Sequence, residues 1–232
     1  MKQYELIVKK NRDILKKQLK QFISEEKYLI FLTRIFKSVS CKNPTSIEDR
    51  IYDFFEIYYP EMTLKLSKEK LSKLIYKSKT FERKRLSNQW VSSESIGLDL
   101  TSGQIEFIEK ILVFFDPKLK WKLKHKLKLQ EILTQEISQL LKNIIPKTSE
   151  LVEDDILCAL LIEKAKGIKT LATKSSNYIQ LLGAETSFFN NYNPKFGLIY
   201  NHQSIKESKD KGKSARILAN KISLKIREDY FK

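Results

Sequence analysis

The stretch YIQLLGAETSFFNNYNPKFGLIYNH, residues 178–202, decides how the C-terminal part of this chain is interpreted. It holds two glycines, although the whole chain of 232 residues has only six. Gly183 follows an apolar run, and Gly197 follows an aromatic residue. Glycine tolerates a positive φ and lets another backbone approach closely. Gly183 is therefore predicted to serve one of these purposes, and the alternative is an ordinary tight crossing of two helices.

The composition outside this stretch is strongly basic. The chain has 44 Lys and Arg residues against 28 Asp and Glu residues, which gives a formal net charge of +16. An excess of this size favours a polyanionic partner, and nucleic acid is the commonest one. The alternative is the codon usage of an AT-rich genome, which enriches Lys, Ile, Asn, Phe and Tyr. Hydrophobic residues make up 41% of the chain, so a core can form.

Several classes of protein are not expected from the sequence. The two cysteines, Cys41 and Cys158, lie far apart, so neither a disulfide framework nor a zinc knuckle is predicted, and an intracellular chain is favoured. The apolar runs at 28–32 and 111–115 are far shorter than the roughly 18 residues of a membrane span. Charges interrupt the N-terminal residues throughout, which is not typical of a signal peptide.

Apolar spacing of three and four residues predicts helices along most of the chain. Residues 3–40 contain no Gly or Pro, and the helix predicted over 47–58 is ended by Pro60. The basic residues 63–90 are interpreted as one irregular helix, 92–104 as a loop, and a new helix is predicted from Ile105. Residues 119–129 alternate like a strand, but their leucines also repeat every four residues, which favours a helix.

The predicted fold class is all-α: a long coiled-coil helical arm followed by a compact helical domain. Residues 1–27 are predicted to form a short N-terminal helical segment, and 28–145 an antiparallel arm with a small insert. Pro146 marks the boundary to the compact domain over 146–232, where four of the six glycines lie. The apolar seams of the arm exceed what one hairpin buries, so the arm is expected to pair with a second chain.

No pattern typical of catalysis is found in the sequence. A glycine-rich nucleotide loop is missing, and so are closely spaced His, Cys or acidic metal ligands. We therefore predict no catalytic residues, no metal site and no cofactor, and interpret the chain as a binding or scaffold protein. The acidic cluster at 153–155 is interpreted as a helix start, which the helix dipole favours.

The last helix predicted from the sequence is amphipathic. A polar stripe is formed by Lys213, Arg216, Asn220, Ser223 and Arg227, and the opposite, buried stripe by Ala215, Leu218, Ala219, Ile222 and Ile226. Residues 206–227 carry eight Lys or Arg and two acids. Beside Tyr200 and His202, such a stripe offers charge to RNA phosphates and flat rings to bases. A solvated helix face would look similar.

The C-terminal half resembles the Nop domain family. The resemblance is carried by residues 178–205, which include LGAE and PKFGLIYNH, and by KGKSARILANKISLKIREDYF at 211–231. Weaker matches lie upstream in DRIYDFFEIYYPEM at 49–62, SESIGLDL at 93–100 and IIPKTSELV at 144–152. The matched blocks keep the family order from about residue 28 to 231.

The resemblance implies a scaffold protein of box C/D ribonucleoproteins. In that family the Nop domain binds a kink-turn RNA already held by a kink-turn-binding protein, and the coiled coil pairs with a second scaffold copy or paralogue. The implied RNA-binding residues are Tyr200, Asn201, His202, Lys211, Lys213, Arg216 and Asn220. The implied protein-partner surface is Gly183, Ala184 and Glu185. Methylation would belong to fibrillarin. The expected localisation is the nucleus and nucleolus, or the cytoplasm in an archaeon.

The chain also departs from the family pattern. Thr186 replaces a usual Lys, Lys147 a usual Asn, and Glu153 stands where Gly is common. Box C/D scaffolds carry a sizeable N-terminal domain that docks fibrillarin, whereas fewer than about 30 residues precede the coiled-coil match here, so fibrillarin is not expected to dock on this chain. Two alternatives stay open: the spliceosomal relative, which binds a small nuclear RNA during splicing, and a degenerate coiled-coil assembly protein that has lost RNA binding.

Overall fold

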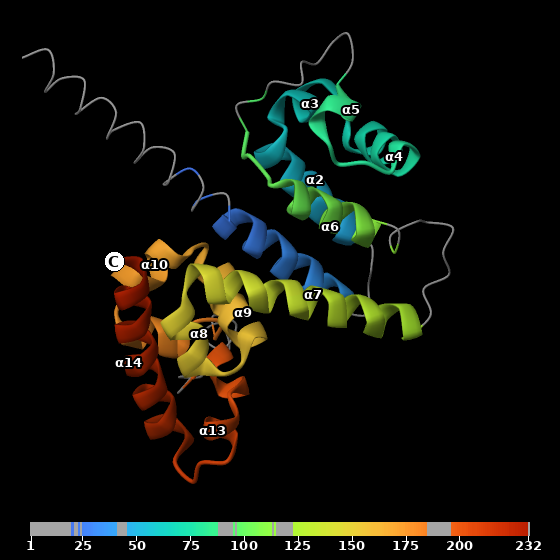
Figure 1. The fold of residues 1–232 in the computed structure, drawn as a ribbon. Coiled ribbons are helices and arrows are strands. Elements are labelled where there is room, and N and C mark those ends of the chain that lie inside the picture. The colour runs from blue at the N-terminus through green and yellow to red at the C-terminus, as the bar shows by residue number, and fades with distance from the viewer. Residues whose placement is uncertain are drawn as a thin grey trace, which may run out of the picture. The chain divides into compact units, whose positions relative to one another are not determined.

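The computed structural model describes residues 20, 23, 25–40, 46–87, 95, 97–112, 114, 123–184 and 196–231. Every regular element in these residues is helical, so the all-α prediction is confirmed (Figure 1). None of the described helices is long and apolar enough to cross a membrane. The chain forms two compact units, a first unit of Met1–Ser24 with Ile35–Glu131, and a second unit of Glu25–Arg34 with Ile132–Lys232.

The first unit consists of short helices. They are residues 35–40 at the end of the helix over 25–40, α2 (Ser46–Tyr58), α3 (Pro60–Lys65), α4 (Lys68–Ser78), α5 (Arg83–Leu86), α6 (Ser102–Leu112) and the start of α7 (Leu123–Ile144). The single irregular helix predicted over 63–90 is therefore wrong. The chain leaves the helical conformation at Leu66, which is extended, and again at Lys79, which adopts a left-handed conformation with φ 50° and ends α4.

An aromatic cluster forms the core of the first unit. The Phe55 and Phe81 rings lie 4.5 Å apart at a steep angle, and the Tyr58 and Phe81 rings stack at 5.3 Å. The Tyr58 hydroxyl donates to the Phe81 carbonyl at 3.0 Å. Burial raises the pKa of Tyr58 to about 12, although the neighbouring Arg83 guanidinium opposes the rise. The phenol therefore stays protonated and keeps this hydrogen bond.

Arg83 connects the end of α2 to the segment that carries the SESIGLDL motif. Its guanidinium donates to the backbone carbonyls of Tyr58 and Leu98 and lies 3.2 Å from the Asp99 carboxylate. The same guanidinium lies 4.4 Å from the centre of the Tyr58 ring. Arg83 thus makes a cation–π contact and partly buried hydrogen bonds, so this part of the motif has a structural role.

Helix α6 begins at Ser102, three residues earlier than the predicted start at Ile105. The Gln104 side chain accepts from the Thr101 amide at 3.0 Å, and the Thr101 hydroxyl accepts from the Gln104 amide at 3.3 Å. This reciprocal pair is a capping box, which satisfies two amide groups at a helix start. The early start was missed because Ser102 and Gly103 are poor helix formers.

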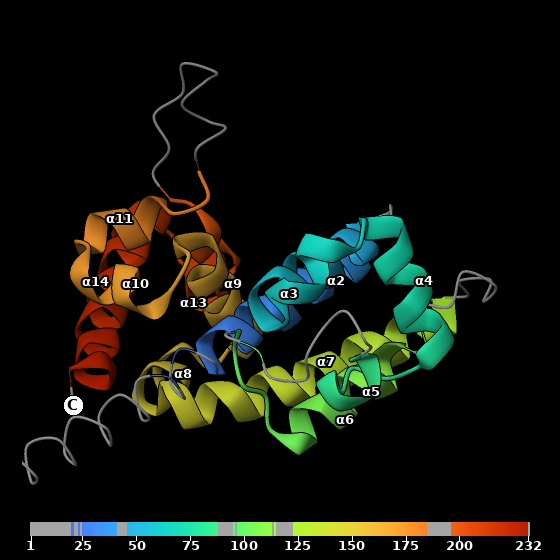
Figure 2. The ribbon, with the colours of Figure 1, turned by 90° about the horizontal axis from the view of Figure 1, so that it is seen from above.

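The second unit consists of the helix over 25–34, the rest of α7, and the C-terminal helices. These are α8 (Pro146–Val152), α9 (Asp155–Ala165), α10 (Ile168–Thr173), α11 (Ser176–Leu181), the 3₁₀ helix η2 (Leu198–Asn201), α13 (Gln203–Lys206) and α14 (Lys211–Tyr230). Helix α14 contacts α8, α10 and α11 (Figure 2). It is the element on which this unit is assembled.

The predicted buried stripe of α14 is confirmed at all five positions: Ala215, Leu218, Ala219, Ile222 and Ile226. The predicted polar stripe is wrong at Ser223, which is buried. Ser223 lies one turn from both Ala219 and Ile226, so it falls at the edge of the buried side, and its small side chain fits there.

A side chain near the end of the chain caps the first helix of the compact domain. The buried Asp229 carboxylate accepts from the backbone amides of Lys147 and Thr148, at 3.3 and 2.9 Å, and from the Thr148 hydroxyl at 2.8 Å. Amides in the first turn of a helix have no partner within the helix, so a carboxylate there is stabilising. Asp229 thus fixes α8 against the C-terminal end of α14.

The helix over 25–34 is bound to the second unit by polar contacts. The Glu26 carboxylate accepts from the Ile168 amide at the start of α10, and Arg34 lies 3.5 Å from Glu163 of α9. The Tyr28 hydroxyl donates to Glu136 of α7 at 3.4 Å. Residues 28–34 and 132–145, which the sequence assigned to the arm, therefore belong to the same compact unit as the C-terminal helices.

The apolar seam of α7 is largely buried within the chain. Leu129, Leu133, Ile137 and Leu140 are buried, whereas Leu127 is 56% exposed. Among the described side chains of α7, Leu127 is the one exposed Leu or Ile. The described part of α7 therefore does not show the excess of exposed apolar side chains that suggested pairing with a second chain. The pairing stays a prediction.

Gly183 and Gly197 lie on either side of a close backbone contact. Gly183 has φ +89°, as one of its predicted roles requires. The Gly197 amide donates to the Gln180 carbonyl and the Leu198 amide to the Leu182 carbonyl, both at 2.8 Å. A Cβ atom added at Gly197 would lie 2.1 Å from the Leu182 carbonyl oxygen. Only glycine fits at this point.

We expect Gly197→Ala to destabilise the protein by about 1–3 kcal/mol, because the added methyl group meets backbone that cannot move aside. Gly103→Ala is the matched control, since nothing lies within 4 Å of the added Cβ atom. There the change should be neutral or slightly stabilising. Urea unfolding followed by circular dichroism measures both, and equal unfolding midpoints for the two variants would contradict the proposed contact.

Candidate nucleic-acid interface

The candidate interface is built on the segment that follows Gly197. The backbone contact with Leu182 fixes the start of η2, and η2 leads directly into α13 and α14. The predicted residues Tyr200, Asn201 and His202 lie in η2 or at its end, and Lys211 and Lys213 lie in the first turn of α14. The fold therefore brings both groups of predicted residues into one continuous segment of the second unit.

His202 is held by hydrogen bonds from both ring nitrogens. Nδ1 accepts from the Ser204 amide at 3.2 Å and lies 2.7 Å from the Ser204 hydroxyl, so the ring caps α13. Nε2 lies 2.9 Å from the Val152 carbonyl oxygen and must carry the proton that it donates there. The lone pair and the N–H bond of an imidazole lie in the ring plane, so these hydrogen bonds are made at the edge of the ring. They fix the orientation of the ring without using its faces.

Val152 belongs to the junction between α8 and α9. Glu153, at the position where the family usually has Gly, adopts a left-handed conformation with φ 55° and ends α8. The Asp154 carboxylate then caps α9 by accepting from the Leu157 amide at 2.9 Å. The helix start predicted for the acidic cluster is confirmed, and the Gly preference at residue 153 is explained by its backbone conformation.

Tyr200 already has two neighbours in the structure. Its ring stacks on Phe196 with 4.6 Å between ring centres and 12° between ring planes. The Lys211 ammonium lies 3.2 Å from the Tyr200 hydroxyl and 5.3 Å from the ring centre. One face of the ring is thus covered by Phe196, which the sequence prediction did not include. The two stacked rings and the cation form a small aromatic platform.

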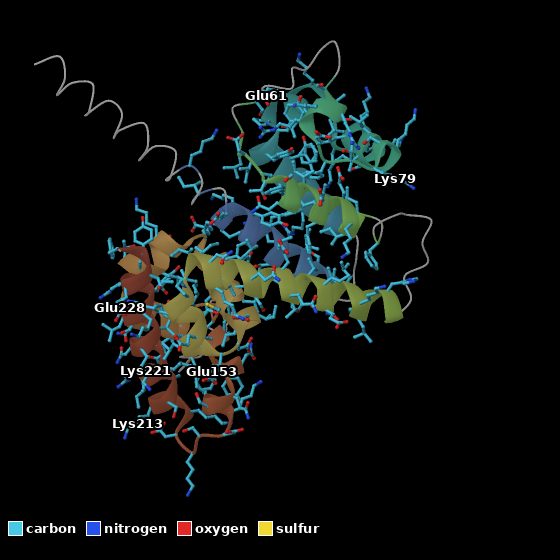
Figure 3. All side chains as sticks on the ribbon, viewed as in Figure 1. Glu61, Lys79, Glu153, Lys213, Lys221 and Glu228 are labelled. Atoms are coloured by element: carbon cyan, nitrogen blue, oxygen red, sulfur yellow. The ribbon has the colours of Figure 1, made fainter. Side chains whose placement is uncertain are left out.

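The exposed face of α14 is cationic. Lys213, Arg216, Asn220 and Lys221 are exposed, and within the part of the chain that the structure describes their side chains make no hydrogen bond or ion pair. Figure 3 shows Lys213 and Lys221 along this helix. Asp210 uses its carboxylate to cap α14, accepting from the Lys213 amide at 3.0 Å. The charge of these cations is therefore available to a partner.

Two apolar residues of α14 were missed by the sequence analysis. Ile217 is 48% exposed and Leu224 is 60% exposed. They are seven residues apart, so they lie on the same side of the helix, and Lys221 lies between them. The spacing of seven residues between Ile217 and Leu224 could have been noticed in the sequence. It was overlooked because the apolar stripe on the buried side has more members.

The predicted protein-partner surface lies at the end of α11. Gly183 is partly exposed, whereas the Ala184 side chain is buried and contributes to packing inside the unit. Glu185 lies outside the described residues, as does Thr186. Among the described residues, no group of three or more His, Cys, Asp or Glu side chains is arranged to hold a metal ion.

Comparison with known proteins assigns this fold to a family. A family model described as "Nop: snoRNA binding domain, fibrillarin" matches residues 41–232, most of the chain. The chain belongs to the Nop family. The Nop match includes both the upstream motifs of the first unit and the whole of α14.

Relatives come from eukaryotes and archaea. Nucleolar protein 56 of Dictyostelium discoideum is 30% identical over 204 residues, covering 78% of this chain and 37% of that protein. A NOP5 family protein of Methanocaldococcus jannaschii is 26% identical over 239 residues, covering 94% and 56%. Nucleolar protein 58 of Schizosaccharomyces pombe is 32% identical over 142 residues, covering 58% and 26%. The chain thus spans less than two thirds of each relative.

We expect His202→Ala to destabilise the protein by about 1–3 kcal/mol, because the buried Val152 carbonyl loses its hydrogen bond and α13 loses its cap. Asn201→Ala is the control, since Asn201 is the exposed neighbour of His202. Thermal unfolding in the absence of RNA measures the effect. An unchanged midpoint for His202→Ala would show that the ring is not a structural cap.

Proposed function

We propose that the chain is an RNA-binding scaffold of a box C/D ribonucleoprotein. It would recognise a kink-turn RNA together with its kink-turn-binding protein, and support guide-directed 2′-O-methylation and rRNA processing without catalysing methyl transfer itself. The Nop family match and relatives named nucleolar proteins 56 and 58 support this role. The observation that carries it is the exposed cationic face of α14 beside the aromatic platform.

Phosphate binding is assigned to α14 in this proposal. Lys213 and Arg216 are exposed and have no acidic partner among the described residues, so binding RNA requires no internal ion pair to break. Lys211 and Lys213 lie in the first turn, where the partial positive charge of the helix dipole also attracts phosphate. Asn220 lies further along the helix and offers both a donor and an acceptor to a ribose or base.

Base stacking is assigned to the rings at residues 200 and 202. Because its in-plane hydrogen bonds already fix the His202 ring, stacking a base on it costs little additional side-chain entropy. Stacking of a base on such a ring contributes about 1–3 kcal/mol. Tyr200 offers at most one ring face, because Phe196 covers the other.

The kink-turn-binding protein is assigned to the apolar part of α14. Ile217 and Leu224 expose aliphatic surface beside the cations, and protein interfaces combine apolar anchors with a polar surround. A face that mixes phosphate-binding cations with apolar area suits a partner made of RNA and protein together. Gly183 and Glu185 would belong to the same protein contact.

The other partners follow from the family. A second Nop scaffold copy or a paralogue would pair through the coiled-coil arm, and fibrillarin would supply the methyltransferase in the assembled particle. The proposed localisation is the nucleolus, or the cytoplasm if the host is an archaeon. Purification of the protein followed by sequencing of the bound RNA tests the particle: guide RNAs support box C/D, and a spliceosomal small nuclear RNA would contradict it.

We expect the double variant Lys213→Glu/Arg216→Glu to lose phosphate contacts to a kink-turn RNA that carries its binding protein. Each lost contact lowers the slope of log affinity against log salt concentration by about 0.7–0.9. The matched control is Lys142→Glu/Lys169→Glu, two exposed lysines of the same unit with the same change of charge. Fluorescence anisotropy titrations at several salt concentrations measure the slope.

Unchanged affinity and slope in the Lys213/Arg216 variant would make this face of α14 a solvated surface and overturn the proposed RNA site. An equal loss in the control variant would also overturn it, because the effect would then follow net charge and not position. His202→Ala should weaken binding with little change in slope, since a stacked base carries no counterion release.

A further inference from the structure

A second basic surface lies in the first unit, which contains none of the residues assigned to RNA so far. Residues 64–86 hold nine Lys or Arg residues and two acids. The cations are Lys65, Lys68, Lys70, Lys73, Lys77, Lys79, Arg83, Lys84 and Arg85, and the acids are Glu69 and Glu82. This local excess is larger than in the α14 region, although the sequence pattern gave it no function.

Some of these cations are neutralised inside the unit. Lys68 pairs with Asp49, Arg85 lies 2.9 Å from Glu82, and Arg83 is committed to Asp99 and the backbone of the SESIGLDL segment. Five others are exposed, and their side chains make no hydrogen bond or ion pair among the described residues: Lys70, Lys73, Lys77, Lys79 and Lys84. We call these five lysines the α4 basic surface.

Helix α4 presents three of the five lysines in a row. Lys70, Lys73 and Lys77 are spaced by three and four residues, so they share one side of the helix over a length of about 10 Å. Leu71 and Ile75 are buried on another side. Lys79 follows at the left-handed end of the helix, as the labelled side chain in Figure 3 shows.

The α4 basic surface is mounted on a fixed framework. The Glu109 carboxylate of α6 accepts from the Thr80 hydroxyl at 2.7 Å and from the Phe81 amide at 2.9 Å. Phe81 is fully buried in the aromatic cluster with Tyr58. The turn between α4 and α5 is therefore held at both its side chains and its backbone. Because the backbone is already fixed, a ligand that binds here has to order only the lysine side chains.

We propose that the α4 basic surface is a second RNA-contacting surface, which binds phosphates of the same RNA without reading its sequence. This inference rests on the proposed function and adds a second point of attachment to it. Lysine is a flexible point charge that suits phosphate backbones, and phosphate contacts position an RNA without specifying its sequence.

An acidic protein segment fits the surface less well. Protein interfaces depend on buried apolar or aromatic anchors. Among the side chains described in α4 and α5, none of the large hydrophobic ones is exposed, and the exposed Leu64 of the same basic region lies on α3, not in the row of lysines. A row of lysines without an anchor gives charge attraction alone, which is how proteins bind nucleic acid non-specifically.

The test compares two triple variants of the whole chain. Lys70→Gln/Lys73→Gln/Lys77→Gln removes the row on α4, and Lys110→Gln/Lys128→Gln/Lys142→Gln removes the same charge from exposed positions elsewhere. Two probes are titrated over a range of salt concentrations, each with its kink-turn-binding protein. One is a minimal kink-turn RNA, and the other carries stems extended by about two helical turns.

The α4 variant should bind the extended RNA with a salt slope lower by about 2–3, and roughly tenfold or more weaker at low salt, because three phosphate contacts are lost. The control variant should bind like the unmodified chain. The thermal midpoint of the α4 variant should not change, since its three lysines have no partner among the described residues.

The Lys213→Glu/Arg216→Glu variant, measured in parallel, separates the two claims. If it loses RNA while the α4 variant binds both probes normally, the proposed function stands and the second surface is refuted, which leaves an acidic protein as its partner. If neither variant is affected, both claims fail. Equal losses in the α4 and control variants would also refute the second surface, because net charge alone would explain them.

Discussion

The contact between Leu182 and Gly197 is the constraint on which the C-terminal unit depends. Two backbone hydrogen bonds join the end of α11 to the start of η2, and no side chain fits between them. Because of this contact, η2 begins at a fixed point, His202 reaches the Val152 carbonyl, and α14 starts where its cations face outward. Asp229 then closes the unit by capping α8 from the far end of α14. The same helix thus provides packing on one side and the proposed RNA contacts on the other.

Acidic and basic side chains have different roles in the structure. Acidic side chains at the key positions serve as caps: Asp154 begins α9, Asp210 begins α14, and Glu109 holds the turn after α4. Each uses its carboxylate on backbone amides or a hydroxyl, so it is not placed to neutralise the exposed cations. The exposed cations of α14 and of the α4 basic surface therefore keep their charge for a polyanion that approaches them.

Helical spacing was sufficient to predict the all-α class and the buried stripe of α14, and the scarcity of glycine pointed to a positive φ or a close approach at Gly183. Those predictions succeeded because packing follows periodicity and because glycine is needed where backbones meet. The sequence did not reveal the breaks at Leu66 and Lys79, since a lysine in the left-handed conformation has no local signature. Nor did it reveal that Phe196 covers Tyr200, because that contact depends on the path of the chain around Gly197. Burial of Ser223 was missed because a small polar residue at the edge of a buried stripe fits either side.

The central claim is that RNA lies on the segment from Phe196 to Asn220. Ultraviolet cross-linking of the protein to a kink-turn RNA with its binding protein, followed by mass spectrometry of the cross-linked peptides, tests it most directly. Cross-links should form at the aromatic platform and His202, where rings and bases are in contact, and in the first turns of α14. Cross-links found only outside residues 196–231 would contradict the proposed interface.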